Sequence, residues 1–305
     1  MPLADDSEAK PDWDRVARYF GSEAFQRLAQ KRVAVIGVGS GGGFAALALA
    51  MAGVGQFVLI DPDRISAANV VRHVADRRHI NQPKAEALAD LIRHRNPAVK
   101  TLSFNGTLDS FPEALAGVDL VVVGVDDEHP KFAINAACRA AGLTAIYAGV
   151  YERGEGGDVA IIPPDNADGA PCYACWALQL RDTAMPTGST PPGAVDLDYG
   201  QARPDGTFAA EPGLWLHVTR IAAAQADMAL NELLRGTTLY RELPGNTVIL
   251  ANVAMEILTG MVVPPYSAQW LTLVRDPQCY VCGQGSQAGD DLSLDTLLGS
   301  EPGEQ

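Results

Sequence analysis

A glycine-rich segment follows a short run of residues typical of a buried strand. The run over 32–37 (RVAVIG) is apolar and β-branched, and the pattern G-x-G-x-x-G continues from it through Gly37, Gly39, Ser40, Gly41 and Gly42. Glycines at this place let phosphate oxygens approach the backbone N–H groups that the first turn of a helix leaves unpaired. The next apolar run ends in Asp61, whose carboxylate can hold ribose hydroxyl groups. The spacing predicts a nucleotide site but does not by itself distinguish NAD from ATP.

Polar and cationic side chains follow Asp61 in the sequence. Asn69 and Arg72 come within the next dozen residues, and Lys84 follows the tripeptide Asn-Gln-Pro. A triphosphate carries more charge than a dinucleotide pyrophosphate, and converging Arg and Lys side chains would neutralise it. The alternative is that Arg72 and Lys84 are solvated surface charges, as most Arg and Lys side chains are.

Two C-x-x-C pairs, Cys172/Cys175 and Cys279/Cys282, account for four of the five cysteines. Each pair offers two thiolates at the separation that a tetrahedral metal needs, so the four complete a closed zinc site. Without an export signal, a metal site is favoured over a disulfide framework, redox chemistry or coincidence. We predict a structural zinc ion with no vacant coordination position. The remaining cysteine, Cys138, is expected to be a small buried hydrophobe on a helix face.

The elements that would position these residues alternate between strand and helix. Strands are predicted over 32–37, 57–61, 118–125 and 144–148, and helices over 13–31, 44–51, 84–94 and 131–142. This alternation predicts an α/β fold, a Rossmann-like doubly wound sheet that is mostly parallel, with a zinc-stapled C-terminal extension. For the extension we predict a hairpin over 149–164, an irregular Pro/Gly-rich stretch over 172–213, a helix over 215–234, strand or helix over 247–259, and a strand over 269–274.

Length and composition limit the class of protein. The chain has 305 residues, of which 47% are hydrophobic, and its formal net charge is -14. A strongly acidic chain argues against nucleic acid as the main partner. Residues 1–14 contain no apolar stretch of a signal peptide, and no run of about 18 apolar residues suggests a membrane span. We expect a cytoplasmic protein.

The motifs together resemble those of the ThiF/MoeB/HesA family of ubiquitin-activating-enzyme-like adenylyltransferases, over about residues 13–284. The matching segments occur in the family's order, and they are GVGSGGG, FVLIDPD, the N-x-x-R of Asn69 and Arg72, QPK ending at Lys84, Asn96-Pro97, DLVVVGVDD, PCYAC and PQCYVCG. The expected organisation is therefore a disordered leader over 1–12, an adenylation domain over 13–284 and a disordered acidic tail over 285–305. The domain would divide into a Rossmann half (about 32–150) and a zinc-stapled half (about 151–284).

The resemblance implies a role for each matching residue. Asp61 would hold the ribose of ATP, and Asn69, Arg72 and Lys84 would orient and neutralise the phosphates. Asp126, which ends the strand GVDD, would hold Mg²⁺. An arginine of the N-terminal helix would reach the nucleotide of the partner subunit in a homodimer; Arg15 fits that place best, and Arg18 is its rival.

The implied reaction joins the C-terminal glycine of a ubiquitin-like or sulfur-carrier protein to AMP as an acyl-adenylate and releases pyrophosphate. A conjugating or sulfur-transfer enzyme would be a further partner. The loop over 205–213, where ubiquitin-type activating enzymes carry a catalytic cysteine, contains none, although Thr207 could in principle act as an oxygen nucleophile. We therefore expect no thioester on this chain.

Two positions depart from the family's pattern. His73 stands where the family often has Gln, and Asp127 stands where it commonly has Asn. We expect His73 to affect contacts behind the site and Asp127 to add negative charge near the metal. Two alternatives stay open: an NAD-dependent oxidoreductase, and a non-catalytic scaffold of the same fold that binds a ubiquitin-like protein or a conjugating enzyme.

Overall fold

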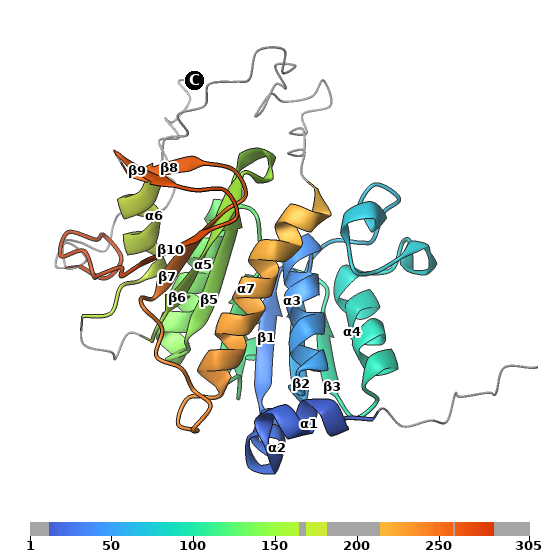
Figure 1. The fold of residues 1–305 in the computed structure, drawn as a ribbon. Helices are drawn as coiled ribbons and strands as arrows, with labels where there is room; N and C mark the ends of the chain where they lie inside the picture. Colours follow the sequence, from blue (N-terminus) through green and yellow to red (C-terminus); the bar gives the residue numbers. More distant parts are fainter. Residues whose placement is uncertain (1–11, 165–168, 182–213, 259, 284–305) are drawn as a thin grey trace, which may run out of the picture.

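An eight-stranded sheet forms the centre of the computed structural model, which describes residues 12–164, 169–181, 214–258 and 260–283 (Figure 1). Its strand order is β10-β7-β6-β5-β4-β1-β2-β3. The strands are β1 (Arg32–Ile36), β2 (Gln56–Ile60), β3 (Lys100–Phe104), β4 (Leu120–Val123), β5 (Ala145–Val150), β6 (Gly156–Ile162), β7 (Thr247–Ala251) and β10 (Ala268–Leu271). The half from β3 to β5 is parallel throughout, and β6, β7 and β10 continue the sheet in antiparallel pairs. The parallel half has the order 3-2-1-4-5 of doubly wound nucleotide-binding folds.

Helices cover both faces of the sheet (Figure 1). One face carries α3 (Ser40–Met51), α4 (Lys84–Arg95) and α7 (Trp215–Leu233), with α1 (Asp14–Phe20) and α2 (Ser22–Gln30) at its lower end. The other face carries α5 (Glu128–Ala141) and α6 (Tyr173–Arg181). Short 3-10 helices lie at Val70–Arg72, Arg77–His79, Leu108–Ser110, Pro112–Leu115 and Glu152–Gly154, and β8 (Met255–Leu258) pairs with β9 (Met261–Val263) outside the main sheet.

The apolar strand runs of the sequence follow from this two-sided burial. In β1, Val33 and Val35 pack against the α3 side, whereas Ala34 and Ile36 pack against the α5 side. All four residues of β4 are likewise buried. A strand covered on both faces needs apolar side chains at every position, and this explains why these strands do not alternate.

Most predicted elements are confirmed, and a few differ. The predicted helix over 13–31 is two helices, α1 and α2, because the chain turns at Gly21 with φ 74°. The helix predicted over 44–51 begins earlier, at Ser40. Segment 247–259 contains two strands rather than a helix.

The elements that were not predicted include β3, β9 and α6, besides the short 3-10 helices. Strand β3 (KTLSF) is only partly buried, so its apolar signal is weak. The prediction of an irregular stretch over 172–213 is wrong at its start, because Tyr173–Arg181 forms helix α6. The N–H of Tyr173, the first residue of α6, donates to the side-chain oxygen of Asn135 on α5 at 3.0 Å.

Several predictions lie outside the described residues. They concern the leader over 1–12 (apart from Asp12), the stretch over 182–213 with Thr207, and the tail over 285–305. None of the helices in the described ranges is long and apolar enough to cross a membrane.

Candidate nucleotide and metal sites

The predicted nucleotide-binding residues meet at the carboxyl ends of three adjacent strands. The glycine loop follows β1, Asp61 follows β2 and Asp126 follows β4, and β1 pairs with both neighbours. The connections after β1 and β4 lead to helices on opposite faces, α3 and α5. In parallel sheets this arrangement opens a crevice at the strand ends, where ligands bind.

The glycines of the loop have different structural tasks. Gly37 has φ 82°, and a Cβ added to it would lie 2.6 Å from the backbone nitrogen of Val125. A Cβ on Gly42 would overlap the carbonyl of Gly37, and one on Gly124 would overlap both Gly37 and Gly42. The loop is therefore joined to the end of β4 by a contact of three glycines, Gly37, Gly42 and Gly124.

The other two glycines face elsewhere. A Cβ on Gly41 would contact Val218 and Ala222 of α7 at 3.6 and 3.8 Å, so Gly41 lets α7 pack beside α3. A Cβ on Gly39 would have no neighbour within 4 Å. Gly39 directly precedes α3, so the open side of the loop is at the start of that helix, where N–H groups are available to an anion.

Asp61 is buried and holds two loops together. Its Oδ2 accepts a hydrogen bond from the N–H of Val38 at 2.8 Å, and its Oδ1 accepts one from the N–H of Asp63 at 2.9 Å. Burial raises the pKa of the Asp61 carboxyl, while nearby Lys84 and these N–H donors oppose the rise. Each carboxylate oxygen accepts more than one hydrogen bond, so Asp61 retains acceptor capacity for hydroxyl groups.

Lys84 begins α4 and points to this same region. Its Nζ lies 2.7 Å from Oδ2 of Asp63 and 4.0 Å from Oδ1 of Asp61, and 13% of its side chain is exposed. The alternative that Lys84 is a solvated surface charge is therefore wrong. Its contact with a phosphate stays a prediction.

Asn69 and Arg72 lie on the segment that follows Asp61. The Asn69 side-chain oxygen accepts a hydrogen bond from the N–H of Ser66 at 2.8 Å, and its amide donates to the carbonyl of Arg64 at 3.4 Å. Asn69 thus shapes the turn that carries Arg72. The Arg72 side chain is exposed at the end of the 3-10 helix Val70–Arg72.

Asp126 and Asp127 are both exposed between β4 and α5. The N–H of Asp127 donates to Oδ1 of Asp126 at 3.2 Å. Hard carboxylate oxygens open to solvent are the ligands that Mg²⁺ prefers, so these two residues fit the predicted cation.

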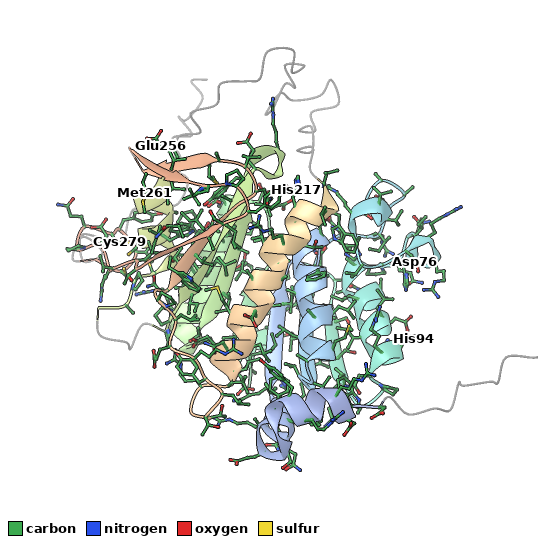
Figure 2. The ribbon with its side chains drawn as sticks, in the orientation of Figure 1. Asp76, His94, His217, Glu256, Met261 and Cys279 are labelled. Carbon is green, nitrogen blue, oxygen red and sulfur yellow. The ribbon has the colours of Figure 1, made fainter. Side chains whose placement is uncertain are left out.

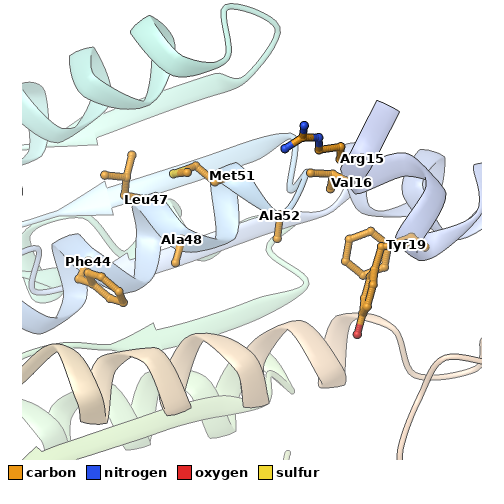
Figure 3. Close-up of a pocket in the computed structure, with 9 residues that line it drawn as sticks. Arg15, Val16, Tyr19, Phe44, Leu47, Ala48, Met51 and Ala52 are labelled. Carbon is orange, nitrogen blue, oxygen red and sulfur yellow. The ribbon is translucent and has the colours of Figure 1, made fainter. Parts of the chain in front are cut away.

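Arg15 lies far from the glycine loop of its own chain. It lines an apolar groove of about 580 Å³ with Met51 and Ala52 at the end of α3 (Figure 3). Because α3 has 12 residues, its two ends are separated by about 18 Å. Arg18 is exposed and pairs with Asp14 at 2.7 Å. Neither arginine contacts the loop within one chain.

The four cysteines of the two pairs come together beside α6, on the side of the antiparallel strands (Figure 2 labels Cys279). Their Sγ atoms all lie within 4.8 Å of one another, and all four residues are buried. The N–H groups of Asp276 and Val281 donate to sulfurs of this cluster, each at 3.4 Å. Four sulfurs and N–H···S bonds suit a tetrahedral thiolate metal site.

Cys138 is buried on α5, where burial raises the pKa of its thiol to about 12. A thiol held protonated in this way is a poor nucleophile. The prediction that Cys138 is a small buried hydrophobe on a helix face is confirmed.

Several residues near the site were not predicted. The Trp215 indole donates to the carbonyl of Ser40 at 3.4 Å, at the start of α7. The Gln225 amide is buried and donates to the carbonyls of Val123 and Ile146 at 2.8 and 2.9 Å. Both depend on the packing of α7 across the sheet, which no local pattern reveals.

Two known activating enzymes are similar to this chain in sequence. SAMP-activating enzyme E1 of Haloferax volcanii is 29% identical over 280 residues, which cover 89% of both chains. Ubiquitin-like modifier-activating enzyme 5 of Aedes aegypti is 33% identical over 165 residues, 50% of this chain and 41% of that protein.

Solved structures of E. coli MccB share the fold. The crystal structure of MccB with ATP has a TM-score of 0.62 at 15% identity, covering 88% of this chain and 74% of that one. The structure with MccA-N7isoASN has a TM-score of 0.63 at 19% identity, covering 90% and 76%. A model of the ThiF family matches residues 14–273. This match spans most of the chain, and the chain belongs to the ThiF family.

Proposed function

We propose that this protein uses Mg-ATP to adenylate the C-terminal glycine of a small ubiquitin-like or sulfur-carrier protein. The proposal depends on one observation: Asp61, just after β2, and Asp126, just after β4, lie on either side of the glycine loop that follows β1. In this proposal one acid would hold the ribose and the other would hold a metal ion on the phosphates. An NAD-dependent oxidoreductase would use the loop and Asp61 but would leave Asp126 without a role. Relatives named as activating enzymes support the adenylation.

Within this proposal each residue binds one part of ATP. The open side of Gly39 and the first N–H groups of α3 receive the phosphates. Asp61, already oriented by two backbone N–H groups, accepts the ribose hydroxyls. Lys84 exchanges Asp63 for a phosphate oxygen, and Arg72 approaches from the exposed segment above the loop. Arg and Lys together offset the charge of the triphosphate.

The reaction requires alignment more than acid–base chemistry. An oxygen of the terminal glycine carboxylate forms a bond to the α-phosphorus, while the bond from that phosphorus to the oxygen bridging to the β-phosphate breaks. The bonding electron pair leaves with pyrophosphate, and no proton moves because the carboxylate is already ionised at neutral pH. Asp126 would hold Mg²⁺, which when bound neutralises the developing charge on the phosphates.

We further propose that the enzyme is a homodimer in which Arg15 acts on the partner's nucleotide. Arg15 is at the opposite end of α3 from the loop of its own chain and beside an exposed apolar groove. Both features suit a helix that packs against a second copy. An arginine supplied in this way stabilises charge on the departing pyrophosphate.

We also propose that the four-cysteine cluster holds a structural Zn²⁺ and that the product is a free acyl-adenylate. The described cysteines are either in this cluster or, as Cys138, in the core. No cysteine occurs over 205–213, which would favour passing the acyl group to a conjugating or sulfur-transfer enzyme.

Pyrophosphate exchange tests the proposal. Labelled pyrophosphate should enter ATP only when a small carrier protein ending in Gly-Gly is present, and not with a carrier that lacks its last glycine. Asp126→Ala should lower the rate at least about 100-fold, whereas Asp109→Ala, at an exposed aspartate of a 3-10 helix outside the site, should have no effect. Exchange that fails with every such carrier while NADH binds tightly would refute adenylation. Full biological activity of Asp126→Ala would support a non-catalytic scaffold.

A further inference from the structure

Helix α6 begins inside the cysteine cluster. Cys172 directly precedes the helix and Cys175 lies in its first turn, so a metal held by these cysteines fixes where α6 starts. Tyr173 lies between the two cysteines and is buried. Its side chain extends away from the cluster toward α5.

Tyr173 connects α6 to α5 by two hydrogen bonds and to β5 by one ring contact. Its hydroxyl donates to Oε2 of Glu128 at 2.7 Å. Its N–H donates to the Asn135 side chain at 3.0 Å, and its ring stacks on buried Tyr147 with centroids 4.4 Å apart. Backbone, ring and hydroxyl are therefore all fixed, and the hydroxyl has one defined direction.

Glu128 is the first residue of α5, two residues after Asp126. Its second oxygen, Oε1, lies 3.1 Å from the Nζ of Lys131, whose side chain is only 6% exposed. With one oxygen held by Lys131 and the other by Tyr173, the first turn of α5 has a fixed position. A carboxylate here also interacts favourably with the positive end of the helix.

A second residue of α6 reaches the same group of charges. Burial raises the pKa of the Asp158 carboxyl on β6, and Trp176, three residues after Tyr173, helps to lower that pKa, as Lys131 does. Residues three apart share one face of a helix. One face of α6 therefore supplies Tyr173 and Trp176 to the charged groups below the start of α5.

The Asp126 carboxylate is bonded to the backbone just before α5. Among the hydrogen bonds within the described residues, Asp126 accepts only the one from the N–H of Asp127, the residue before α5. Its exposed side chain is thus oriented by the backbone that leads into the first turn of α5. A shift of that turn would move the carboxylate directly.

We propose that Tyr173 is a positioning residue through which the cysteine cluster fixes Asp126 for binding the metal–nucleotide complex. The inference rests on the proposed role of Asp126 in adenylation. It assigns to the cluster a function at the nucleotide site beyond holding the C-terminal segment in place.

Tyr173→Phe tests this with little change in packing, because the ring remains and only the hydroxyl is lost. The probe is Mn²⁺ with ATP, followed by electron paramagnetic resonance. We expect Mn-ATP to bind about tenfold more weakly, as is usual when a residue behind a metal ligand is changed, while metal-free ATP binds as in the wild type. Zinc content and Tm should stay unchanged. Tyr240→Phe, which removes the hydroxyl of a tyrosine whose ring faces the Arg235 guanidinium near the far end of α7, should change neither binding constant.

Unchanged Mn-ATP binding by zinc-loaded Tyr173→Phe would overturn the inference. If that variant lost zinc, Glu128→Gln would test the inference instead, because it leaves the residues next to the cysteines intact. Weaker Mn-ATP binding by Glu128→Gln with full zinc content would support the inference. Unchanged Mn-ATP binding would overturn it. Adding Tyr173→Phe to Glu128→Gln should produce no further loss. These measurements do not need a carrier protein, so a failure of pyrophosphate exchange in the wild type would reject the proposed function separately.

Discussion

The imidazole of His73 donates a hydrogen bond from Nε2 to the carbonyl of Val38 at 2.7 Å. The direction follows from the other ring nitrogen: the N–H of Ala75 donates to Nδ1 at 2.9 Å, so Nδ1 carries no proton and Nε2 does. His73 is buried and neutral, and it joins the segment after Asp61 to the middle of the glycine loop. The expected contact of His73 behind the site is therefore its hydrogen bond to the Val38 carbonyl.

Protonation of His73 should weaken nucleotide binding. Burial lowers the pKa of His73, the Val38 carbonyl opposes that decrease, and Lys84 and His79 add to it. Because the folded pKa lies below the usual 6.5, the stabilising contact is present above pH 6.5 and is lost as the pH falls through the folded pKa. A second ring proton would face the N–H of Ala75.

Calorimetric titration with ATP from pH 7.5 to 5 measures this effect. The wild type should lose affinity at the acid end more steeply than His73→Gln, whose amide does not titrate. His94→Gln, at an exposed histidine of α4, should follow the wild type. Parallel curves for the wild type and His73→Gln would show that His73 does not respond to pH in this range.

Gly39→Ala should separate binding from stability. The position has φ -70° and open space around its Cβ, so the folded protein should keep its Tm. If the phosphates lie here, the added methyl group should weaken ATP binding about tenfold or more. Gly42→Ala should instead destabilise the fold by about 3 kcal/mol or more, because its Cβ would meet rigid backbone. Thermal unfolding and ATP titration of both variants check this; normal ATP affinity of Gly39→Ala would place the phosphates elsewhere.

Asp158 should make the folded protein less stable as the pH rises toward 7. Burial raises the pKa of its carboxyl to about 7, partly offset by Lys131 and the Tyr151 hydroxyl. Its protonated form is favoured in the folded state, so its stabilisation is full below pH 3.8 and is lost as the pH rises through about 7. The loss corresponds to roughly 4 kcal/mol at most.

Urea unfolding of the wild type and Asp158→Asn at pH 5 to 8 isolates this contribution. The variant, which is neutral throughout, should gain stability relative to the wild type up to about pH 7 and then keep a constant difference. Asp109→Asn, at an exposed aspartate, should show no such trend. If the difference in unfolding free energy between the wild type and Asp158→Asn were constant from pH 5 to 8, Asp158 would not titrate in that range.

Thiol reactivity should distinguish the four clustered cysteines from Cys138. With metal bound, none of the five cysteines should react quickly in the native protein, because Cys138 is buried with a pKa of about 12. A strong chelator should expose four thiols and release one metal ion per chain. Cys138→Ala should retain full metal content, and Cys279→Ser should not. Four slow thiols that persist after chelation would contradict a metal site.

Mixing two inactive variants tests whether Arg15 acts across subunits. Arg15→Ala and Asp126→Ala should each abolish exchange, but a mixed dimer contains one site with both residues intact. Random pairing at equal concentrations should restore about a quarter of the wild-type rate. Replacing Arg15→Ala by Arg18→Ala in the mixture identifies which arginine acts. No recovery after verified exchange of subunits would place the arginine within one chain or remove it from the mechanism.

The parts of the site that the sequence predicts are those set by local pattern. The strand–loop–helix unit at Gly37, the ends of β2 and β4 at Asp61 and Asp126, and the paired cysteines all follow from burial or spacing along the chain. Helix α6 was missed because its start depends on Asn135 of another helix. The role of Gln225 was missed for a similar reason. Gln225 lies on an ordinary helix, and only the assembled sheet brings it to the carbonyl of Val123.

The contact of Gly37, Gly42 and Gly124 has a consequence for engineering the enzyme. Because no side chain fits at these positions, the loop and the end of β4 keep one relative geometry in any functional variant. A mutant library aimed at new nucleotides should therefore hold all three glycines fixed. Diversity is better placed at Gly39 and at the exposed Arg72 and Asp127, where side chains can change without disturbing that geometry.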